Sequence, residues 1–448
     1  MGRSSRGLNI GQVLQPFQEF FRQQASGGIV LMVCTVAALV WANSPLAGSY
    51  DALWHTQLSV GLGGWTIAKP LHSWINDGLM AIFFFSVGLE IKREFLVGEL
   101  ATMKKAMLPI SAAVGGMLVP AVLYLALNAG RPGASGWGIP MATDIAFALG
   151  VLAILGDRVC LSVKIFLTAL AIADDIGTVL VIALFYTADL SFYAFAVAAV
   201  FLGALIAANR AGVHNPLVYT FLGFGLWAAF LKTGVHPTVA GVIIAMTIPA
   251  HPRMTDTEFL EKSQKILDAF RSAAGKGARM LASDNQRRSA AALTRASQLV
   301  QTPLQRMEHE LHPWVTFLIM PLFALANAGV SLGAGITDVL TDRVSLGIIA
   351  GLIIGKPIGI TLFAWLAVKS RMAALPGDIS WKDINAAGWL GGIGFTMSLF
   401  IANLAFEGSP YLHVSKVGIL AASLMAGVVG WAMFKSTNAC KGPVSLTG

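Results

Sequence analysis

Long apolar segments separated by short polar ones are the feature that most restricts how this 448-residue chain can fold. A helix needs roughly 17–25 apolar residues to cross the hydrocarbon of a bilayer. The chain is 56% hydrophobic and 12% charged, whereas soluble domains carry about 25% charged residues. We therefore expect an all-α membrane protein with twelve transmembrane helices. The candidate segments are 27–42, 74–91, 107–128, 138–155, 162–185, 191–208, 216–231, 237–250, 313–330, 345–368, 386–405 and 414–434.

Lysine and arginine residues gather in alternate connections between these segments. If the N-terminus is cytoplasmic, most of them lie on the cytoplasmic side, where basic residues of membrane proteins concentrate. We therefore expect one membrane domain, 1–448, with both termini inside, a periplasmic loop at 45–73 and a long basic cytoplasmic loop at 251–312. This topology accounts for the formal net charge of +8 without a nucleic-acid partner.

Two connections are longer than a simple turn requires. The stretch 58–68 alternates around Gly63 and Gly64, which suits a β-hairpin as well as an irregular loop. In the long basic loop, 256–271 and 285–300 have helix-compatible spacing. We expect two solvated or membrane-surface helices there.

Charged side chains inside three apolar segments are the second restriction. Thr143 and Asp144 lie near the middle of the fourth segment, Asp174 and Asp175 are adjacent at the centre of the fifth, and Lys356 is central in the tenth. Such charges are costly in a bilayer and usually mark ion paths. A helix-packing hydrogen bond is an alternative for one aspartate, but it explains two adjacent ones less readily.

Two carboxylates suit the exchange of a cation for protons. A hard cation such as Na⁺ prefers oxygen ligands, and the same oxygens can carry protons. Neighbours on a helix point about 100° apart, so Asp174 and Asp175 cannot play identical roles. Lys356 must either lose its proton or pair with a carboxylate. We expect Asp174 to be its partner, either as a structural tie or as part of proton exchange.

Helix breaks coincide with two of the segments. Gly391, Gly392 and Gly394 interrupt the eleventh segment, and Pro140 with the following Thr-Asp pair could interrupt the fourth. Interrupted segments in corresponding positions of two inverted repeats point to a transporter's binding site. Close helix packing at small residues is the alternative reading of the glycines.

Titratable residues also gather near the cytoplasmic ends of two segments. Glu308, His309 and His312 precede the ninth segment, and Glu90 and Glu94 end the second. Histidine titrates near physiological pH, so this region is a candidate pH sensor. A solvated helix start and a positive-inside anchor are the plainer alternatives.

Other functions with buried aspartates remain to be weighed. An intramembrane aspartyl protease would carry a GxGD motif, and the sequence has none. The residues alone do not separate a cation channel or a symporter from an exchanger.

Several motifs together resemble the NhaA-type Na⁺/H⁺ antiporters of bacteria. They run across nearly the whole membrane part: WINDGLMAIFFFSVGLEIKRE (74–94), ATDIAFALG (142–150), LAIADDIG (170–177), LKTGVHPTVAGV (231–242), LHPWV (311–315), PLFALANAGVSL (321–332), IIGKPIGI (353–360) and GIGFTMSLFIA (392–402).

The resemblance implies a fold and a function. Twelve helices would form inverted repeats, with the fourth and eleventh unwound and crossed. The protein would be an electrogenic, pH-regulated transporter of the inner membrane, not an enzyme. It would export Na⁺ or Li⁺ against inward protons, serve pH homeostasis and salt tolerance, and need no cofactor. It would be a homodimer joined by an outside β-hairpin, which 58–68 could supply.

The resemblance also implies residue roles. Asp174 and Asp175 would bind the transported Na⁺ and protons, Asp144 with Thr143 would balance helix-end dipoles at the break, and Lys356 would pair with the site. The pH-sensing region would comprise Glu308, His309, His312, Glu90 and Glu94. The sequence departs from the family in the length of the loop 251–305.

Overall fold

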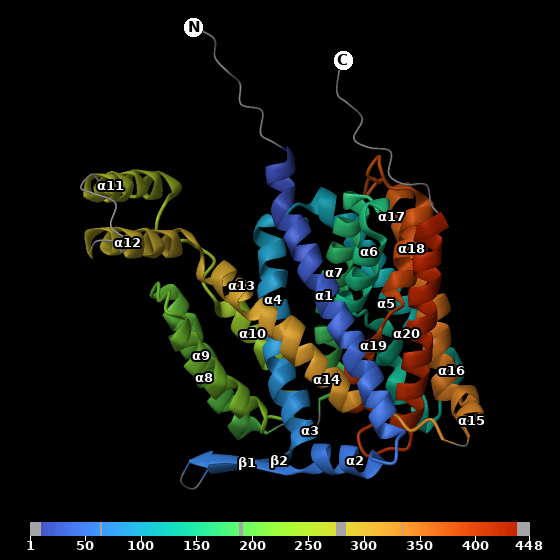
Figure 1. Cartoon of the computed structure of the whole chain (residues 1–448). Coiled ribbons are helices and arrows are strands. Elements are labelled where there is room, and N and C mark those ends of the chain that lie inside the picture. The colour runs from blue at the N-terminus through green and yellow to red at the C-terminus, as the bar shows by residue number, and fades with distance from the viewer. Residues whose placement is uncertain (1–9, 63–64, 188–190, 275–283, 334, 437–448) are drawn as a thin grey trace.

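The computed structural model describes residues 10–62, 65–187, 191–274, 284–333 and 335–436. Helices make up most of these ranges, as the apolar segments predict (Figure 1). The bundle consists of α1 (Ile10–Ala42), α4 (Met80–Val97), α5 (Met103–Asn128), α6 (Ile145–Leu155), α7 (Leu161–Phe185), α8 (Phe192–Arg210), α9 (Pro216–Phe230), α10 (Thr238–Thr247), α13 (Pro303–Trp314), α14 (Met320–Asn327), α16 (Arg343–Ala350), α17 (Lys356–Lys369), α18 (Trp381–Gly391), α19 (Phe395–Ala405) and α20 (Tyr411–Ser436).

Shorter elements connect or flank the bundle. The peripheral helices are α2 (Ala47–His55), α3 (Leu71–Ser73), α11 (Asp256–Ala274), α12 (Asp284–Val300) and α15 (Ile336–Thr341). The 3₁₀ segments are Pro132–Met141 and Gly156–Arg158, and the π-helical segments are Trp74–Leu79, Val315–Ile319 and Gly351–Gly355.

Several helical segments are long and apolar enough to cross a membrane. Within the described ranges, seven qualify singly, and two bent pairs raise the number to nine at most. One bent pair is α18 with α19, which meet at 45°. The helices α9 and α10 are apolar but shorter, as the short segments 216–231 and 237–250 predict. The fold is therefore a helical membrane bundle with at least one broken segment.

Small residues let α5 and α17 pack backbone against backbone. A Cβ at Gly115 would lie 2.2 Å from the carbonyl oxygen of Gly359, and one at Gly359 would lie 2.1 Å from that of Gly115. Close approach at small residues is typical of membrane helices. A Cβ at Gly116 would lie 3.6 Å from Cδ of Lys356. This packing holds the lysine stem against α5.

Two antiparallel strands lie at one end of the bundle, which we call the hairpin end (Figure 1). In the sheet, β1 (Gln57–Leu62) pairs with β2 (Trp65–Pro70), with Leu62 opposite Trp65. The indole of Trp74 donates a hydrogen bond of 2.9 Å to the carbonyl oxygen of Leu58, which ties the sheet to the bundle. Gly63 and Gly64 lie outside the described residues.

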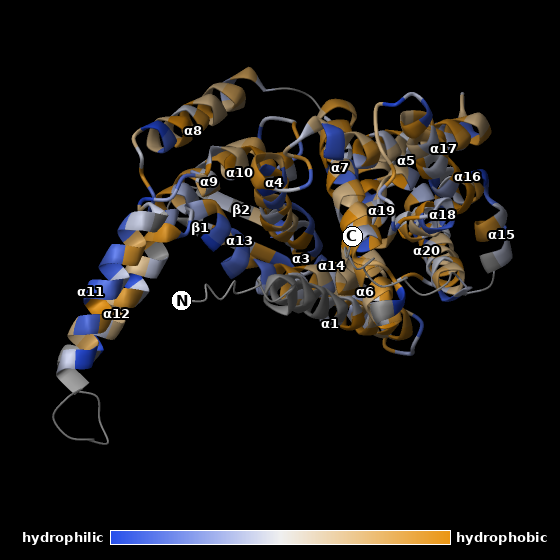
Figure 2. Cartoon of the chain, turned by 90° about the horizontal axis from the view of Figure 1, so that it is seen from above, coloured by the Kyte–Doolittle hydropathy of each residue, from blue (hydrophilic) through white to orange (hydrophobic). Residues whose placement is uncertain are grey.

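The helices α11 and α12 project side by side from the other end of the bundle, and we call this pair the arm (Figures 1 and 2). They occupy the stretches where helical spacing is seen in the sequence. Figure 2 shows hydrophilic residues over much of the arm, whereas hydrophobic residues dominate the bundle. The glycine-containing connection between the two helices falls in 275–283, outside the described residues.

Candidate functional site

Two interrupted helices cross in the interior of the bundle. The 3₁₀ segment Pro132–Met141 gives way to extended backbone before α6 begins, and a second break separates α18 from α19. The Asp144 amide donates to the carbonyl oxygen of Ile393 at 2.6 Å. The Thr143 hydroxyl donates to that of Gly391 at 2.8 Å. Unpaired backbone groups are costly away from water, so each break stabilises the other.

Asp144 occupies the centre of this crossing and is 1% exposed. One carboxylate oxygen accepts a 3.0 Å hydrogen bond from the Phe147 amide and caps α6. The other accepts from the amide of Thr396 at 3.1 Å and from its hydroxyl at 2.5 Å. The carboxylate therefore faces the N-terminal ends of α6 and α19, where helix dipoles favour negative charge.

Lys356 and Asp174 form a buried ion pair beside the crossing. Lys356 Nζ lies 2.7 Å from Oδ2 of Asp174 and donates to the Thr143 hydroxyl at 2.9 Å. Lys356 and Asp174 are each 1% exposed. The contact predicted between these two residues is confirmed. It joins α7 and α17 to the break before α6.

Asp175 faces a different environment from its neighbour. Its side chain lines a cavity of about 50 Å³. In the described part of the chain, we find no hydrogen-bond or ion-pair partner for its carboxylate, and Asp174 Oδ1 also has none. The adjacent aspartates thus face differently, as expected from helix geometry. The Asp175 carboxylate is therefore available to a cation or a proton that enters this cavity.

The cavity leads from the crossing toward the arm end. Asp144, Thr143 and Thr396 line it at the crossing, and Glu90 and His312 line it further along α4 and α13. On the hairpin side, a buried amide cluster joins the two sides of the bundle. These amides are Asn327, which donates to Asn76 Oδ1 at 2.9 Å, and Asn403, which donates to Asn327 Oδ1 at 2.6 Å.

Four side chains form an arm-end cluster near this cavity. Arg93 lies 3.0 Å from Glu308, 3.2 Å from Glu94 and 3.9 Å from Glu90, measured between side-chain nitrogen and oxygen atoms. Burial raises the pKa of Glu308 above its ordinary value, and the Arg93 charge opposes this shift. The cluster therefore joins α4 to α13.

The two predicted histidines are placed differently. His312 lines the cavity, and burial, aided by the charges of His309 and Arg93, lowers its pKa. His309 lies on the exposed side of α13. The structure thus brings Glu90, Glu94 and Glu308 together and leaves His309 at the periphery.

Two contributors were not assigned to the site from the sequence, and Arg93 was interpreted only as part of a positive-inside anchor. Arg93 is the centre of the arm-end cluster, although its position three residues after Glu90 was visible in the pattern. Thr396 holds Asp144, and its only signal was a hydroxyl residue two positions after the GGIG break. The amide cluster gave no sequence signal, because isolated asparagines are common at helix ends.

Comparisons with known proteins add independent evidence. The family described as Na⁺/H⁺ antiporter 1 matches residues 18–434. The Na⁺/H⁺ antiporter NhaA of Oleidesulfovibrio alaskensis is 50% identical over 95% of this chain and 95% of its own length. NhaA 2 of Syntrophotalea carbinolica is 50% identical over 97% of this chain and 99% of its own. NhaA of Koribacter versatilis is 50% identical over 96% of this chain and 93% of its own length.

Proposed function

The chain belongs to the Na⁺/H⁺ antiporter 1 family, and on this premise we propose that it exchanges Na⁺ for protons across a membrane. It acts as a secondary transporter, not as an enzyme, and needs no cofactor beyond the ions it moves. The observation that carries the proposal is the buried crossing, where the Asp175 carboxylate has no partner among the described residues and lies next to the Lys356–Asp174 ion pair.

The arrangement allows cation and protons to compete for the same oxygens. A cation that reaches the crossing through this cavity meets the Asp175 carboxylate, which lines it. Because Na⁺ prefers oxygen ligands, it also attracts the Asp174 carboxylate and weakens that residue's bond to Lys356. The lysine proton and a carboxyl proton are then released. Reprotonation from the other side displaces the cation, and exchange follows if the site faces each side in turn.

The proposal extends to the orientation of the bundle in the membrane, its topology, the ions carried and the charge moved. The arm end is cytoplasmic, together with both termini, and the hairpin end is periplasmic in the inner membrane of a bacterium. Twelve membrane segments form inverted repeats in which α6 and α18–α19 are the interrupted members. Li⁺ is carried as well as Na⁺. Exchange is electrogenic because more than one proton moves per cation.

Regulation by pH is assigned to the arm-end cluster. Glu90 lines the cavity. Of the three carboxylates around Arg93, Glu90 is the most distant, because Glu308 and Glu94 lie closer to the guanidinium. Protonation of Glu308 weakens its hold on Arg93, so the guanidinium shifts toward Glu90 at the cavity while Glu94 still contacts it. This change hinders the access of cations at acidic pH.

The two-stranded sheet is proposed to join two protomers. Its strands project beyond α8 and α9 at the hairpin end, away from the crossing (Figure 1). Deleting 58–68 should give monomers that still exchange ions, because the crossing lies within one chain. Light scattering in detergent checks this, and a deletion variant that stays dimeric would rule out this interface.

The protease alternative receives no support from the site or from the relatives. Both aspartates lie on α7, and one is engaged by a lysine. A protease needs two carboxyls that share a water molecule across two helices. A channel or a symporter is distinguished from an exchanger by the direction of proton movement.

The experiment uses everted membrane vesicles acidified by respiration and a fluorescent pH probe. Adding Na⁺ or Li⁺ should raise the internal pH and restore fluorescence, whereas K⁺ tests selectivity. Asp174→Asn should abolish the response, while Asp338→Asn, at an exposed aspartate of α15, should leave it unchanged. No response in the parent protein, or an acidification of the vesicles on adding Na⁺, would contradict antiport.

A further inference from the structure

A buried hydroxyl on α7 has no hydrogen-bond partner among the described residues. It belongs to Thr178, which is 2% exposed. Oδ1 of Asp174, one turn earlier on the same helix, is in the same condition. A buried polar group without a partner costs free energy, and such groups in native proteins usually have a functional role or hold an ion or a water molecule. The two oxygens therefore indicate a ligand beside the aspartate pair.

Other threonines in the helices satisfy their hydroxyls within their own helix. Thr168, also on α7, donates to the carbonyl oxygen of Lys164 at 2.9 Å. Thr35 in α1 and Thr220 in α9 donate to carbonyl oxygens four residues earlier, at 2.7 and 3.1 Å. A threonine hydroxyl inside a helix commonly makes this bond. Thr178 makes no such bond within the described chain, so its hydroxyl remains free for another group.

Helix geometry directs this hydroxyl toward the aspartate pair. Thr178 follows Asp174 by four residues and Asp175 by three, and side chains at these spacings are neighbours on a helix. Side chains also tilt toward the helix N-terminus, which here is the direction of the pair. Three residues rise about 4.5 Å along the axis. A cation of the size of Na⁺ fits between two oxygens at such a separation, because Ca²⁺, of similar radius, has oxygen ligands at about 2.3–2.6 Å.

Thr178 lies on the hairpin side of the pair. Beyond the C-terminal end of α7, the Tyr186 hydroxyl donates to the carbonyl oxygen of Ser135 at 2.8 Å, and the Ser135 hydroxyl donates to that of Ala405 at 3.4 Å. Ala405 ends α19, two residues after Asn403 of the buried amide cluster. Asp175 lines the cavity that leads toward the arm end, whereas Thr178 is not among its lining residues. The hydroxyl is therefore one helical turn deeper than the carboxylate that an entering cation meets.

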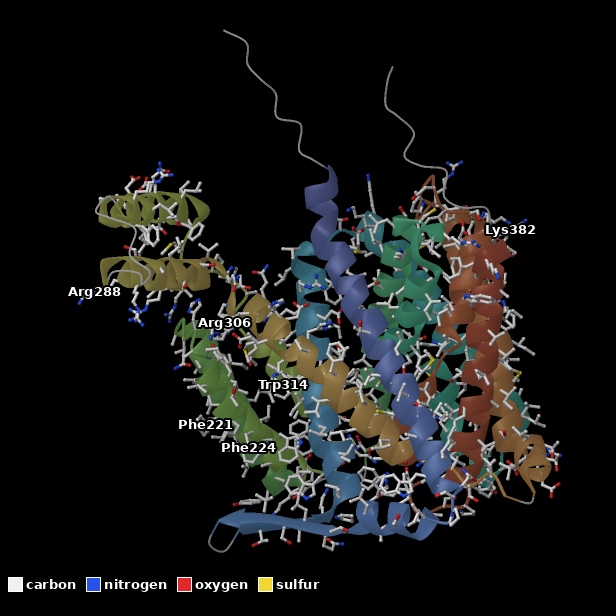
Figure 3. The ribbon with its side chains drawn as sticks, in the orientation of Figure 1. Phe221, Phe224, Arg288, Arg306, Trp314 and Lys382 are labelled. Carbon is white, nitrogen blue, oxygen red and sulfur yellow. The ribbon has the colours of Figure 1, made fainter. Side chains whose placement is uncertain are left out.

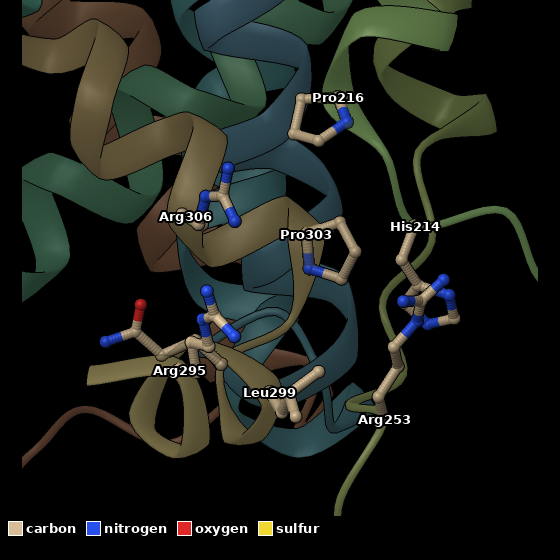
Figure 4. A pocket seen from close by; sticks show the side chains of 8 residues that line it. His214, Pro216, Arg253, Arg295, Leu299, Pro303 and Arg306 are labelled. Atoms are coloured by element: carbon tan, nitrogen blue, oxygen red, sulfur yellow. The ribbon is translucent and has the colours of Figure 1, made fainter. Parts of the chain in front are cut away.

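A larger pocket elsewhere in the molecule does not suit a cation. It has a volume of about 240 Å³ and lies where the arm joins the bundle. Figure 4 shows Arg253, Arg295 and Arg306 around it, and none of its lining residues is acidic. Figure 3 shows Arg306 close to the arm and Trp314 farther along α13. Guanidinium groups repel cations, so the crossing, with its carboxylates, is the better cation site.

We propose that the Thr178 hydroxyl is a ligand of the transported cation and completes its coordination beside Asp175 on the hairpin side. This inference rests on the function proposed above, because it names a further ligand for the same cation. A hard cation prefers oxygen ligands, and a hydroxyl supplies one without adding a charge. The carboxylates still exchange the protons, so Thr178 sets the affinity for the cation and not the number of protons moved.

The test compares Thr178→Val, which removes the hydroxyl at similar volume, with Thr178→Ser, which retains it. Everted vesicles and a fluorescent pH probe give the KM for Na⁺ and the maximal rate. In Thr178→Val, we expect the KM for Na⁺ to rise about threefold to tenfold, with a maximal rate within about twofold of the parent protein. Thr178→Ser should stay close to the parent. Thr168→Val is the matched control, because it removes a hydroxyl of the same helix that is already bonded.

Thermal unfolding of the purified full-length protein separates a cation ligand from a structural group. Thr178→Val removes a polar group that has no partner, so the unfolding midpoint without Na⁺ should stay unchanged or rise. Bound Na⁺ stabilises the folded protein. At constant ionic strength, the rise in midpoint that subsaturating Na⁺ produces should be smaller in Thr178→Val than in the parent, and unchanged in Thr168→Val. If Thr178→Val does not insert into the membrane, Thr178→Ala makes the same test.

Three results would overturn the proposal. One is an unchanged KM for Na⁺ in the folded Thr178→Val protein, which would leave the hydroxyl to a water molecule. Another is a KM raised as much in Thr178→Ser as in Thr178→Val. A third is a lower unfolding midpoint with an unaltered response to Na⁺, which would show a packing role. Failure of the proposed function is a separate result, because the parent protein itself would then give no Na⁺-driven proton movement.

Discussion

The crossing and the arm-end cluster both hold acidic and basic side chains, but their surroundings differ. At the crossing, Asp174 and Lys356 are each 1% exposed. In the arm-end cluster, the Arg93 side chain is 32% exposed and the Glu308 side chain 21%. Charge interactions are strong in a dry interior and are screened near water. The same chemistry therefore has larger consequences at the crossing.

This difference in exposure indicates that the two regions have different functions. If one charge at the crossing is lost, its partner is left as an unpaired charge in an apolar interior. A cation and protons must therefore replace one another there. A charge in the cluster can gain or lose a proton while the other carboxylates still hold Arg93. The crossing is suited to transport, and the cluster is suited to adjusting it.

The largest effect is expected at Asp175, for whose carboxylate the described part of the chain offers no partner. Asp175→Asn should lower Na⁺-driven proton movement by about a hundredfold or more, because an amide offers neither the charge nor the proton site that exchange needs. Vesicle fluorescence measures the rate, and Asp338→Asn is the control. Near-normal exchange in Asp175→Asn would remove the distinction between the crossing and the cluster.

A second effect is expected from breaking the buried ion pair. Lys356→Gln leaves Asp174 without its counterion, and removing one partner of a buried pair costs about 3–5 kcal/mol. The thermal unfolding midpoint should fall, and the charge moved per cycle should fall with it. Current on a solid-supported membrane, compared with proton flux, measures this. Unaltered charge movement in a transporting variant would leave the lysine with a structural role alone.

A third effect compares two helix caps. Asp144→Ala removes the cap of α6 and the acceptor for Thr396, so it should cost about 2–3 kcal/mol of unfolding free energy. Ser191→Ala removes the cap of α8, where the hydroxyl accepts from the Ala194 amide at 3.4 Å, and should cost about 1 kcal/mol. Thermal unfolding in detergent ranks the two. Equal losses would show that the crossing adds nothing beyond an ordinary cap.

The smallest effect is expected in the arm-end cluster. Burial raises the pKa of Glu308, so the folded protein favours the protonated carboxyl, and this contribution to stability is lost as pH rises through the raised value. Glu308→Gln removes the charge of this carboxyl but leaves Glu94 to hold Arg93, so it weakens the pH response without closing the cavity at every pH. The pH of half-maximal exchange should therefore move upward by less than about one unit, since the group is partly screened.

Maximal exchange in Glu308→Gln should stay near that of the parent protein. Rates measured across a pH series check both quantities, with Glu310→Gln, at an exposed neighbour, as the control. An unchanged profile would reduce the cluster to a solvated helix start. A collapse of maximal exchange at every pH would place Glu308 in the transport path instead.

The sequence predicted the features that follow from general rules about membrane helices. Apolar length identified the bundle, and the rarity of intramembrane charge singled out Asp144, Asp174, Asp175 and Lys356. The pairing of Lys356 with Asp174 followed from the cost of a lone ammonium. Partners that depend on tertiary placement did not follow. Thr396 reaches Asp144 only because two breaks cross, and a threonine among apolar residues carries no such signal.

The central claim is that Na⁺ and protons compete for one set of oxygens at the crossing. Calorimetry of Na⁺ binding to the purified protein, repeated in buffers of different ionisation enthalpy, counts the protons released by binding. The account predicts proton release in the parent protein and in Glu308→Gln, and neither proton release nor binding heat in Asp175→Asn. Na⁺ binding that releases no protons in the parent protein would contradict it.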